Sequence, residues 1–193
     1  MGKSLKIGCV VMAAGNASRF GSNKLTSLLD GQSLIRRALN IVPHTAAQNT
    51  AVVTQYPEIA DVAKEYNFTV IFNTTPEKGI SETVKLGLSS LQMCDGLLFL
   101  VADQPLLRQE TVTALIEFWL QHPDHIVALS HNGQRGNPCL FPARFFPELM
   151  ALEGDHGGST VIRRHPEALL LLETDAHQLA DTDTPAQLEQ LQQ

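Results

Sequence analysis

The chain has few cysteines, and none of them is paired with another at a spacing typical of a metal site. Its three cysteines, Cys9, Cys94 and Cys139, lie far apart in the sequence. An odd number of isolated cysteines argues against a disulfide framework and against a zinc site. It indicates a protein of a reducing compartment, and we therefore expect a cytoplasmic location.

Long apolar runs and an excess of basic residues are also missing. No stretch approaches the roughly 20 apolar residues that a membrane helix needs, and residues 1–4 lead so directly into the first predicted strand that we expect no secretory signal. The net charge is −6 at pH 7, whereas general nucleic-acid binders need a basic surface. We therefore predict no membrane and no nucleic-acid partner, and a local basic site for any anionic substrate.

The composition is that of an ordinary globular protein. The chain has 193 residues, of which 44% are apolar and 18% charged, and we expect one domain, 1–193, that buries about two-thirds of its unfolded surface. Strand-like and helix-like patterns alternate along its length. Strands are predicted at 7–12, 50–54, 69–72, 97–101, 126–130, 138–141 and 168–173, and helices at 34–42, 57–66, 81–91, 110–121, 143–152, 159–165 and 185–191. This alternation predicts an α/β domain with a mainly parallel sheet and with 97–101, the most apolar strand, at its centre.

One stretch near the start combines a strand with a turn of small residues and two cations. After the strand at 7–12 the chain continues with Ala13, Ala14, Gly15, Ser18, Arg19, Gly21 and Lys24. Backbone N–H groups of such a turn can face an anion, Arg19 can hold phosphate oxygens with its guanidinium, and Lys24 adds a point charge. These features favour a triphosphate site over an ordinary turn with two solvated cations. Neither a Walker A loop nor a dinucleotide fingerprint fits the spacing.

Acidic side chains follow two of the predicted strands. Asp103 comes directly after the central strand, at the same edge of the sheet as Gly15, and its carboxylate would suit Mg²⁺ better than it would suit a simple loop cap. The segment 181–185, with Asp181 and Asp183, precedes the last helix. By itself that segment favours a helix cap made by Asp183 or Thr184.

Several residues are given a structural interpretation from their patterns alone. Ser33 and Ser81 are predicted to cap the helices that follow them. Trp119 lies on the apolar face of the helix at 110–121 and is predicted to belong to the core. His122 and His125 have no further ligands nearby in the sequence, which favours a solvated loop over a zinc site.

The stretch at 13–24 resembles the nucleotidyltransferase signature A-A-G-x-S-x-R-F/M-G-x-x-K. The chain is most similar to the molybdenum cofactor nucleotidyltransferases, the MobA-like family, and within it to the cytidylyltransferase, or MocA-like, branch. The resemblance spans nearly the whole chain, from residue 7 to about residue 190. It implies a single-domain, Rossmann-like, three-layer fold of the nucleotide-diphospho-sugar transferase type, with a mainly parallel central sheet.

The resemblance also implies roles for individual residues. The expected nucleotide-binding residues are Ala13, Ala14, Gly15, Ser18, Arg19, Gly21, Lys24, Gly79, Ser81 and Thr83. Arg19, Lys24 and Asp103 would be the catalytic residues, and Asp103 and Asp183 would hold Mg²⁺ or Mn²⁺. The residues expected to face the pterin substrate are Arg135, Gly136, Asn137, Pro138 and Asp155. Glu82 and Asn137 depart from the residues that the family usually has at these places.

The expected reaction is the metal-dependent transfer of a nucleoside monophosphate from an NTP to molybdopterin, with release of pyrophosphate. The resemblance favours CTP, because the guanylyltransferase branch commonly has Gly-Gly in place of Ala13-Ala14 and Asn in place of Asp around Asp183. A molybdoenzyme or its chaperone is a further candidate partner. The alternatives are guanylyl transfer to the same cofactor, a transferase that uses a nucleotide sugar, and a cofactor-binding protein without catalysis. The base, the exact acceptor, the oligomeric state and the choice between Asp181 and Asp183 stay open.

Overall fold

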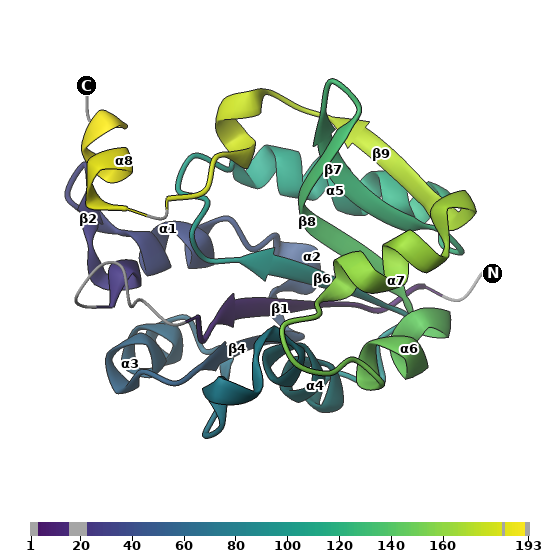
Figure 1. Ribbon diagram of the computed structural model, residues 1–193, viewed down its shortest axis with the longest axis horizontal. Coiled ribbons are helices and arrows are strands. Elements are labelled where there is room, and N and C mark those ends of the chain that lie inside the picture. The colour runs from purple at the N-terminus through teal and green to yellow at the C-terminus, as the bar shows by residue number, and fades with distance from the viewer. Residues whose placement is uncertain (1–3, 16–22, 183, 192–193) are drawn as a thin grey trace.

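The computed structural model describes residues 4–15, 23–182 and 184–191, and a seven-stranded sheet lies at its centre (Figure 1). The strand order is β5-β4-β1-β6-β8-β7-β9. The strands are β1 (Ile7–Ala13), β4 (Thr50–Thr54), β5 (Thr69–Phe72), β6 (Gly96–Val101), β7 (Ile126–His131), β8 (Gln134–Pro142) and β9 (Leu169–Glu173). Every neighbouring pair is parallel except the two pairs that β8 forms with β6 and β7. The predicted mainly parallel sheet with 97–101 at its centre is therefore confirmed.

Helices cover both faces of this sheet, which makes three layers (Figure 1). One face is covered by α1 (Leu34–Asn40), α2 (His44–Ala47), α3 (Pro57–Glu65) and α5 (Gln109–Gln121). The other is covered by α4 (Ile80–Ser90), α6 (Phe146–Met150) and α7 (Gly158–Arg164). Short elements complete the described chain: η1 (Lys24–Thr26), β2 (Leu28–Leu29), β3 (Gln32–Ser33), η2 (Pro76–Lys78), η3 (Ala143–Phe145), η4 (Pro166–Ala168), η5 (Ala176–Leu179) and α8 (Pro185–Gln190).

Two apolar cores lie between the layers, because successive side chains of a strand point to opposite faces. In β1, Cys9 and Val11 belong to one core, whereas Val10 belongs to the other. Trp119 of α5 is fully buried in the first core, which confirms its predicted place. Within the described ranges, no helix combines the length and the apolar character that crossing a bilayer requires.

The predicted cap of α4 by Ser81 is wrong. Gly79 is the N-cap residue, with φ +87°, and Ser81 is already the second residue of the helix. A glycine adopts such a φ without the steric cost that a Cβ would add. Ser33 does occupy the N-cap position of α1, but its side chain makes no capping bond. Thr184 makes a full capping box with Gln187 at the start of α8, so it provides the cap that the sequence assigned to Asp183 or Thr184.

Other predicted elements differ from the structure as well. β8 begins at Gln134 rather than at 138, because Asn132 (φ +50°) and Gly133 (φ +74°) form a tight turn that pairs β7 with β8. Asn-Gly in a two-residue turn is a strong hairpin signal. The helix predicted at 34–42 is shorter, because α1 ends at Asn40 with Ile41 as its C-cap. Pro43 is instead the N-cap of α2, a helix that was not predicted from the sequence. The single helix predicted at 143–152 is the 3-10 turn η3 followed by the shorter α6.

Candidate active site

The carboxyl ends of β1 and β6 lie side by side in the middle of the sheet. The two strands are parallel, and Met12 is paired with Val101. The chain leaves β1 to continue in β4 on one side, while β6 lies on the other side. Such a point, at which the strand order changes direction, is where open α/β sheets bind their ligands. Asp103 follows β6 at this edge. Ala13, which ends β1, and the next two residues, Ala14 and Gly15, also lie here; they are the described part of the predicted turn, and we name them the glycine turn.

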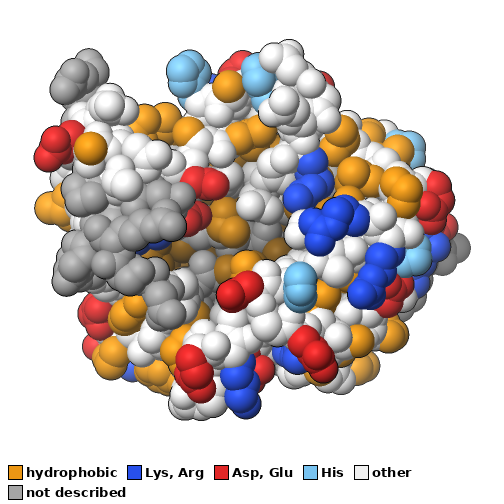
Figure 2. Space-filling view, in the orientation of Figure 1, with side chains coloured by type: hydrophobic (Ala, Val, Ile, Leu, Met, Phe, Trp, Pro, Cys, Tyr) orange, Lys and Arg blue, Asp and Glu red, His pale blue; other side chains and the backbone are white. Residues whose placement is uncertain are grey.

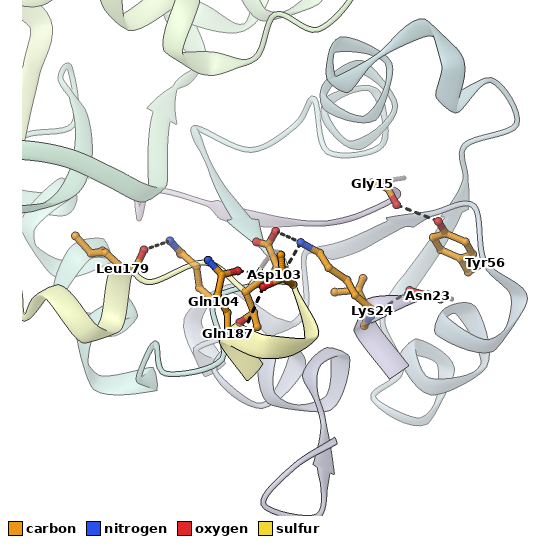
Figure 3. Close-up of polar contacts among 11 residues, drawn as sticks. Gly15, Asn23, Lys24, Tyr56, Asp103, Gln104, Leu179 and Gln187 are labelled. Carbon is orange, nitrogen blue, oxygen red and sulfur yellow. Dashed lines mark hydrogen bonds and ion pairs between the residues drawn. The ribbon is translucent and has the colours of Figure 1, made fainter. Parts of the chain in front are cut away.

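Lys24, Asp103 and Thr182 meet here, although they come from the beginning, the middle and the end of the chain. The Lys24 Nζ lies 2.8 Å from Asp103 Oδ2 and donates to the carbonyl of Thr182 at 3.2 Å (Figure 3). The Thr182 N–H donates to the carbonyl of Asp103 at 3.0 Å. Asn23 caps the short helix η1 through Leu25 N, which orients Lys24 at its start. The prediction that the turn after strand one and Asp103 share an edge is confirmed.

The oxygen atoms around Lys24 are those that a hard divalent cation prefers. The Asp103 carboxylate is 26% exposed and the Thr182 carbonyl lies beside it, and both are oxygen ligands of the kind that Mg²⁺ and Mn²⁺ take. In the part of the chain that the structure describes, no group of three His, Cys, Asp or Glu side chains could hold a metal by itself. Mg²⁺ is usually bound by one or two carboxylates together with substrate phosphates, and Asp103 supplies one such carboxylate. Asp183, the second predicted ligand, lies outside the described residues.

A cavity of about 310 Å³ opens between the glycine turn and Asp103, and we name it the glycine-turn cavity. It is lined by Met12, Ala14, Gly15, Pro76, Gly79, Ile80, Thr83, Val101, Asp103 and Asp155. Of the predicted nucleotide-binding residues, Ala14, Gly15, Gly79 and Thr83 therefore face one space. Ala13 is buried in β1 and Ser81 in α4. Ser18, Arg19 and Gly21 lie outside the described residues.

Gly79 joins this cavity to the loop at 153–158. A Cβ at position 79 would lie 2.5 Å from Asp155 Oδ1 and from the carbonyl group of Gly154. The Ser81 N–H donates to the Gly154 carbonyl at 3.1 Å, which ties the loop to the first turn of α4. Residue 79 is consequently restricted to glycine by both its φ and its neighbours.

A second cavity, of about 230 Å³, adjoins the first, and we name it the β8 cavity. Met12, Ile80, Val101 and Asp155 line both. Its walls combine apolar side chains with polar ones: Val84, Phe99, Phe141 and Leu149, and Arg135, Asn137, Asp155 and Ser159. Figure 2 shows this face of the molecule hollowed near its middle, with Lys and Arg side chains gathered on one side of the hollow and Asp and Glu side chains on the other.

Strand direction explains why the predicted pterin-facing residues reach this edge. β8 runs antiparallel to β6, with Phe99 opposite Cys139, so the beginning of β8 lies beyond the carboxyl end of β6. Arg135 and Asn137 line the β8 cavity, and together with Gly136 they also line an outer cavity of about 380 Å³ that includes Asp181. Pro138 is buried within β8.

The thiol of Cys139 lies at the base of this segment. Arg135 Nη1 donates to Cys139 Sγ at 3.4 Å. Burial raises the pKa of the Cys139 thiol, and the nearby Arg135 guanidinium opposes this only in part. The thiol is therefore neutral at pH 7 and acts as a small, weakly polar wall of the cavity.

A group of side chains that was not predicted from the sequence donates hydrogen bonds to the glycine turn. Thr54, Gln55 and Tyr56 follow one another at the end of β4 and donate to the carbonyls of the turn. The argument that located Asp103 could have found them, because the carboxyl ends of neighbouring parallel strands lie at one edge. Thr182 was also missed, since its role depends on its backbone and no side-chain pattern marks it.

Comparisons with known proteins identify a family and a fold for the chain. A family model, the MobA-like NTP transferase domain, matches residues 9–169. The purine catabolism protein PucB of Bacillus subtilis is 26% identical over 189 residues, which cover 91% of each chain. The crystal structure of Rv0371c from Mycobacterium tuberculosis superposes with a TM-score of 0.82 at 20% identity over 98% of both chains. Its complex with manganese superposes with a TM-score of 0.75 at the same identity, over 96% of this chain and 97% of that one.

A structure from another organism extends the likeness. The molybdopterin-guanine dinucleotide biosynthesis protein A from Archaeoglobus fulgidus superposes with a TM-score of 0.72 at 14% identity over 96% of both chains. At such identities the solved structures establish the fold, and they confirm the three-layer architecture of the nucleotide-diphospho-sugar transferase type that the sequence predicted.

Proposed function

The chain belongs to the MobA-like NTP transferase family, and from this premise we propose that it transfers a nucleoside monophosphate from CTP to the phosphate of a molybdopterin cofactor. Pyrophosphate is the other product. The observation that carries the proposal is that Lys24 contacts both the Thr182 carbonyl and Asp103. Asp103 lines the glycine-turn cavity, which adjoins a second cavity with an arginine. In this proposal the glycine-turn cavity binds the NTP donor and the β8 cavity binds the acceptor.

The proposed chemistry needs no nucleophile from the protein. The acceptor phosphate attacks the α-phosphorus of the NTP, so catalysis depends on the alignment of two anions and on stabilisation of their charge. In the free protein the Lys24 ammonium balances the Asp103 carboxylate. We propose that Lys24, with Arg19, binds the triphosphate, while Asp103 and Asp183 hold Mg²⁺ or Mn²⁺. The bound ion would neutralise charge on the phosphate oxygens. The manganese complex of the Mycobacterium tuberculosis neighbour supports a divalent ion in this fold.

The β8 cavity is the proposed acceptor site. Its apolar wall suits the flat rings of a pterin, and Arg135 and Asn137 can bind the polar groups of the ligand. The shared boundary at Val101 and Asp155 would bring the acceptor phosphate close to the donor. A molybdopterin acceptor is supported by the Archaeoglobus fulgidus neighbour, which acts in molybdopterin-guanine dinucleotide biosynthesis.

The choice of CTP depends on the resemblance to the cytidylyltransferase branch at Ala13, Ala14 and Asp183. Incubation of the protein with purified molybdopterin cofactor, Mg²⁺ and each of the four NTPs tests it, with pyrophosphate release and the mass of the dinucleotide product as readouts. We expect a cytidine dinucleotide that forms only when the acceptor is present. A guanosine product would overturn the base assignment, and no product with any NTP would overturn the proposed acceptor reaction.

A further inference from the structure

Three consecutive side chains at the end of β4 hold the three consecutive carbonyls of the glycine turn. Thr54 Oγ1 donates to the Ala13 carbonyl at 3.0 Å, Gln55 Nε2 to the Ala14 carbonyl at 2.8 Å, and Tyr56 Oη to the Gly15 carbonyl at 3.0 Å. Figure 3 shows the tyrosine reaching the glycine carbonyl from the side away from Asp103. No carbonyl of the turn is left out of this arrangement, which is more than the pairing of β1 with β4 requires.

The direction of these carbonyls determines the direction of the neighbouring N–H groups. A trans peptide unit is planar, so its C=O and N–H point in opposite directions. With the carbonyls of Ala13 and Ala14 directed at side chains from β4, the N–H groups of Ala14 and Gly15 point away from β4. Both residues line the glycine-turn cavity. The arrangement thus presents amide dipoles of the favourable sign to an anion and keeps carbonyl oxygens, which would repel it, turned away.

The Thr54 hydroxyl connects the set internally. Thr54 is fully buried, and its Oγ1 also accepts a hydrogen bond from the Tyr56 N–H at 3.1 Å. The orientation of the hydroxyl is therefore fixed by one hydrogen bond that it donates and one that it accepts. A loop that is ordered before binding loses less conformational entropy when its ligand arrives.

We propose that Thr54, Gln55 and Tyr56 are positioning residues that hold the glycine turn in its anion-binding orientation, and that the group they prepare it for is the triphosphate of the nucleotide. The inference rests on the proposed function. None of the three is among the described residues that line the glycine-turn cavity, so they act through the turn. Their effect depends on the phosphates and is independent of the base and of the acceptor.

The two tyrosines of the chain provide a matched test. Tyr66 Oη donates to Asn40 Oδ1 at 2.7 Å, away from the turn. Tyr56→Phe removes the bond to the Gly15 carbonyl, and Tyr66→Phe removes the bond to Asn40. The dissociation constants of inorganic tripolyphosphate and of CTP, each with Mg²⁺, are measured by calorimetry. We expect Tyr56→Phe to weaken both ligands by about fivefold, the effect of one hydrogen bond, and Tyr66→Phe to leave both unchanged. Gln55→Leu should act as Tyr56→Phe does.

The two buried threonines of β4 separate positioning from stability. Thr50 Oγ1 donates to the Ala46 carbonyl at 2.9 Å and Thr54 Oγ1 to the Ala13 carbonyl. Thr50→Val and Thr54→Val should both lower the melting temperature. Only Thr54→Val should weaken tripolyphosphate binding. Thr54→Ser keeps the hydroxyl and should bind tripolyphosphate as the wild-type protein does.

The outcomes distinguish the inference from the function on which it rests. If the wild-type protein binds CTP while Tyr56→Phe and Gln55→Leu bind it equally well, the positioning role is overturned and the proposed function stands. If Tyr66→Phe loses as much affinity as Tyr56→Phe, the positioning role is also overturned. If the wild-type protein binds no nucleotide, the proposed function is overturned and this inference with it.

Discussion

The two halves of the site are built from strands that run in opposite directions. On the proposed donor side, β1 and β6 end at the site edge, and they place backbone groups and a carboxylate there. On the proposed acceptor side, β8 begins there, and its first residues place side chains over an apolar wall. The comparison shows how one edge of a sheet can present two kinds of chemistry. Strand ends offer backbone groups that suit phosphates, whereas the beginning of an antiparallel strand offers side chains that suit a larger organic acceptor.

The largest expected effect comes from the Asp103 carboxylate on the proposed donor side. Asp103→Asn should lower kcat by about a thousandfold, because it weakens the proposed site for the divalent ion that would neutralise phosphate charge. Turnover with CTP and cofactor measures this. Asp30→Asn is the control, because Asp30 pairs with Arg37 at 2.9 Å on the surface. Near-normal turnover of Asp103→Asn would contradict the metal assignment.

Substitution of Lys24 or Arg135 should distinguish nucleotide binding from cofactor binding. Lys24→Met should weaken CTP binding by about tenfold to a hundredfold and leave cofactor binding unchanged, whereas Arg135→Gln should do the reverse, because each removes a charge-assisted contact to one ligand only. Binding of each ligand by calorimetry provides the measurement. Arg36→Gln, on α1 and paired with Glu65, is the neutral control. Loss of both ligands in either variant would show that the halves are not separate.

The stability of the protein should be sensitive to substitution of Gly79, which lies where α4 contacts the loop of Gly154 and Asp155. Gly79→Ala adds a Cβ against Asp155 and Gly154 at a positive φ, and we expect a loss of about 2 kcal/mol of unfolding free energy. Gly133→Ala has a similar φ but no atom within 4 Å of the added Cβ, so it should cost about 1 kcal/mol. Urea denaturation compares the two. Equal losses would mean that the packing of the loop at 153–158 against α4 contributes little.

The smallest expected effect concerns the hairpin that carries Arg135. Glu173 accepts hydrogen bonds from Ser130 Oγ and from the N–H groups of Gly133 and Asn132, and the Ser130 bond is the main cause of its lowered pKa. A lowered pKa in the folded state means that the carboxylate stabilises the fold above its ordinary pKa of 4.5, and that this stability is lost as the pH falls through the folded value. The difference in urea midpoint between wild type and Glu173→Gln should therefore shrink in acid. A difference that stays constant from pH 7 to pH 3 would contradict it.

The order of the elements could be predicted because its signals are local. The apolar strands at 50–54 and 69–72 and the helix at Pro57 agree with the structure within a residue, and Trp119 is in the core as predicted. The predicted start of β8 was wrong because the turn at Asn132 and Gly133 was not recognised. The predicted cap at Ser81 was wrong because Gly79, which has a positive φ, is the N-cap. The roles of the site residues stay predictions. Four of these residues, Ser18, Arg19, Gly21 and Asp183, lie outside the part of the chain that the structure describes.

Residue types alone determined that this protein has a small-residue turn after its first strand, an aspartate after its most apolar strand and an α/β alternation throughout. They did so because helical and strand periodicity and turn chemistry act over a few neighbouring residues. Only the tertiary structure decided that Lys24 contacts the Thr182 carbonyl across 158 positions of the chain. It also decided that Thr54, at the end of β4, and the next two residues bind the carbonyls of the glycine turn. Such contacts depend on which strands become neighbours in the sheet, and that is settled by packing of the whole chain rather than by any local pattern.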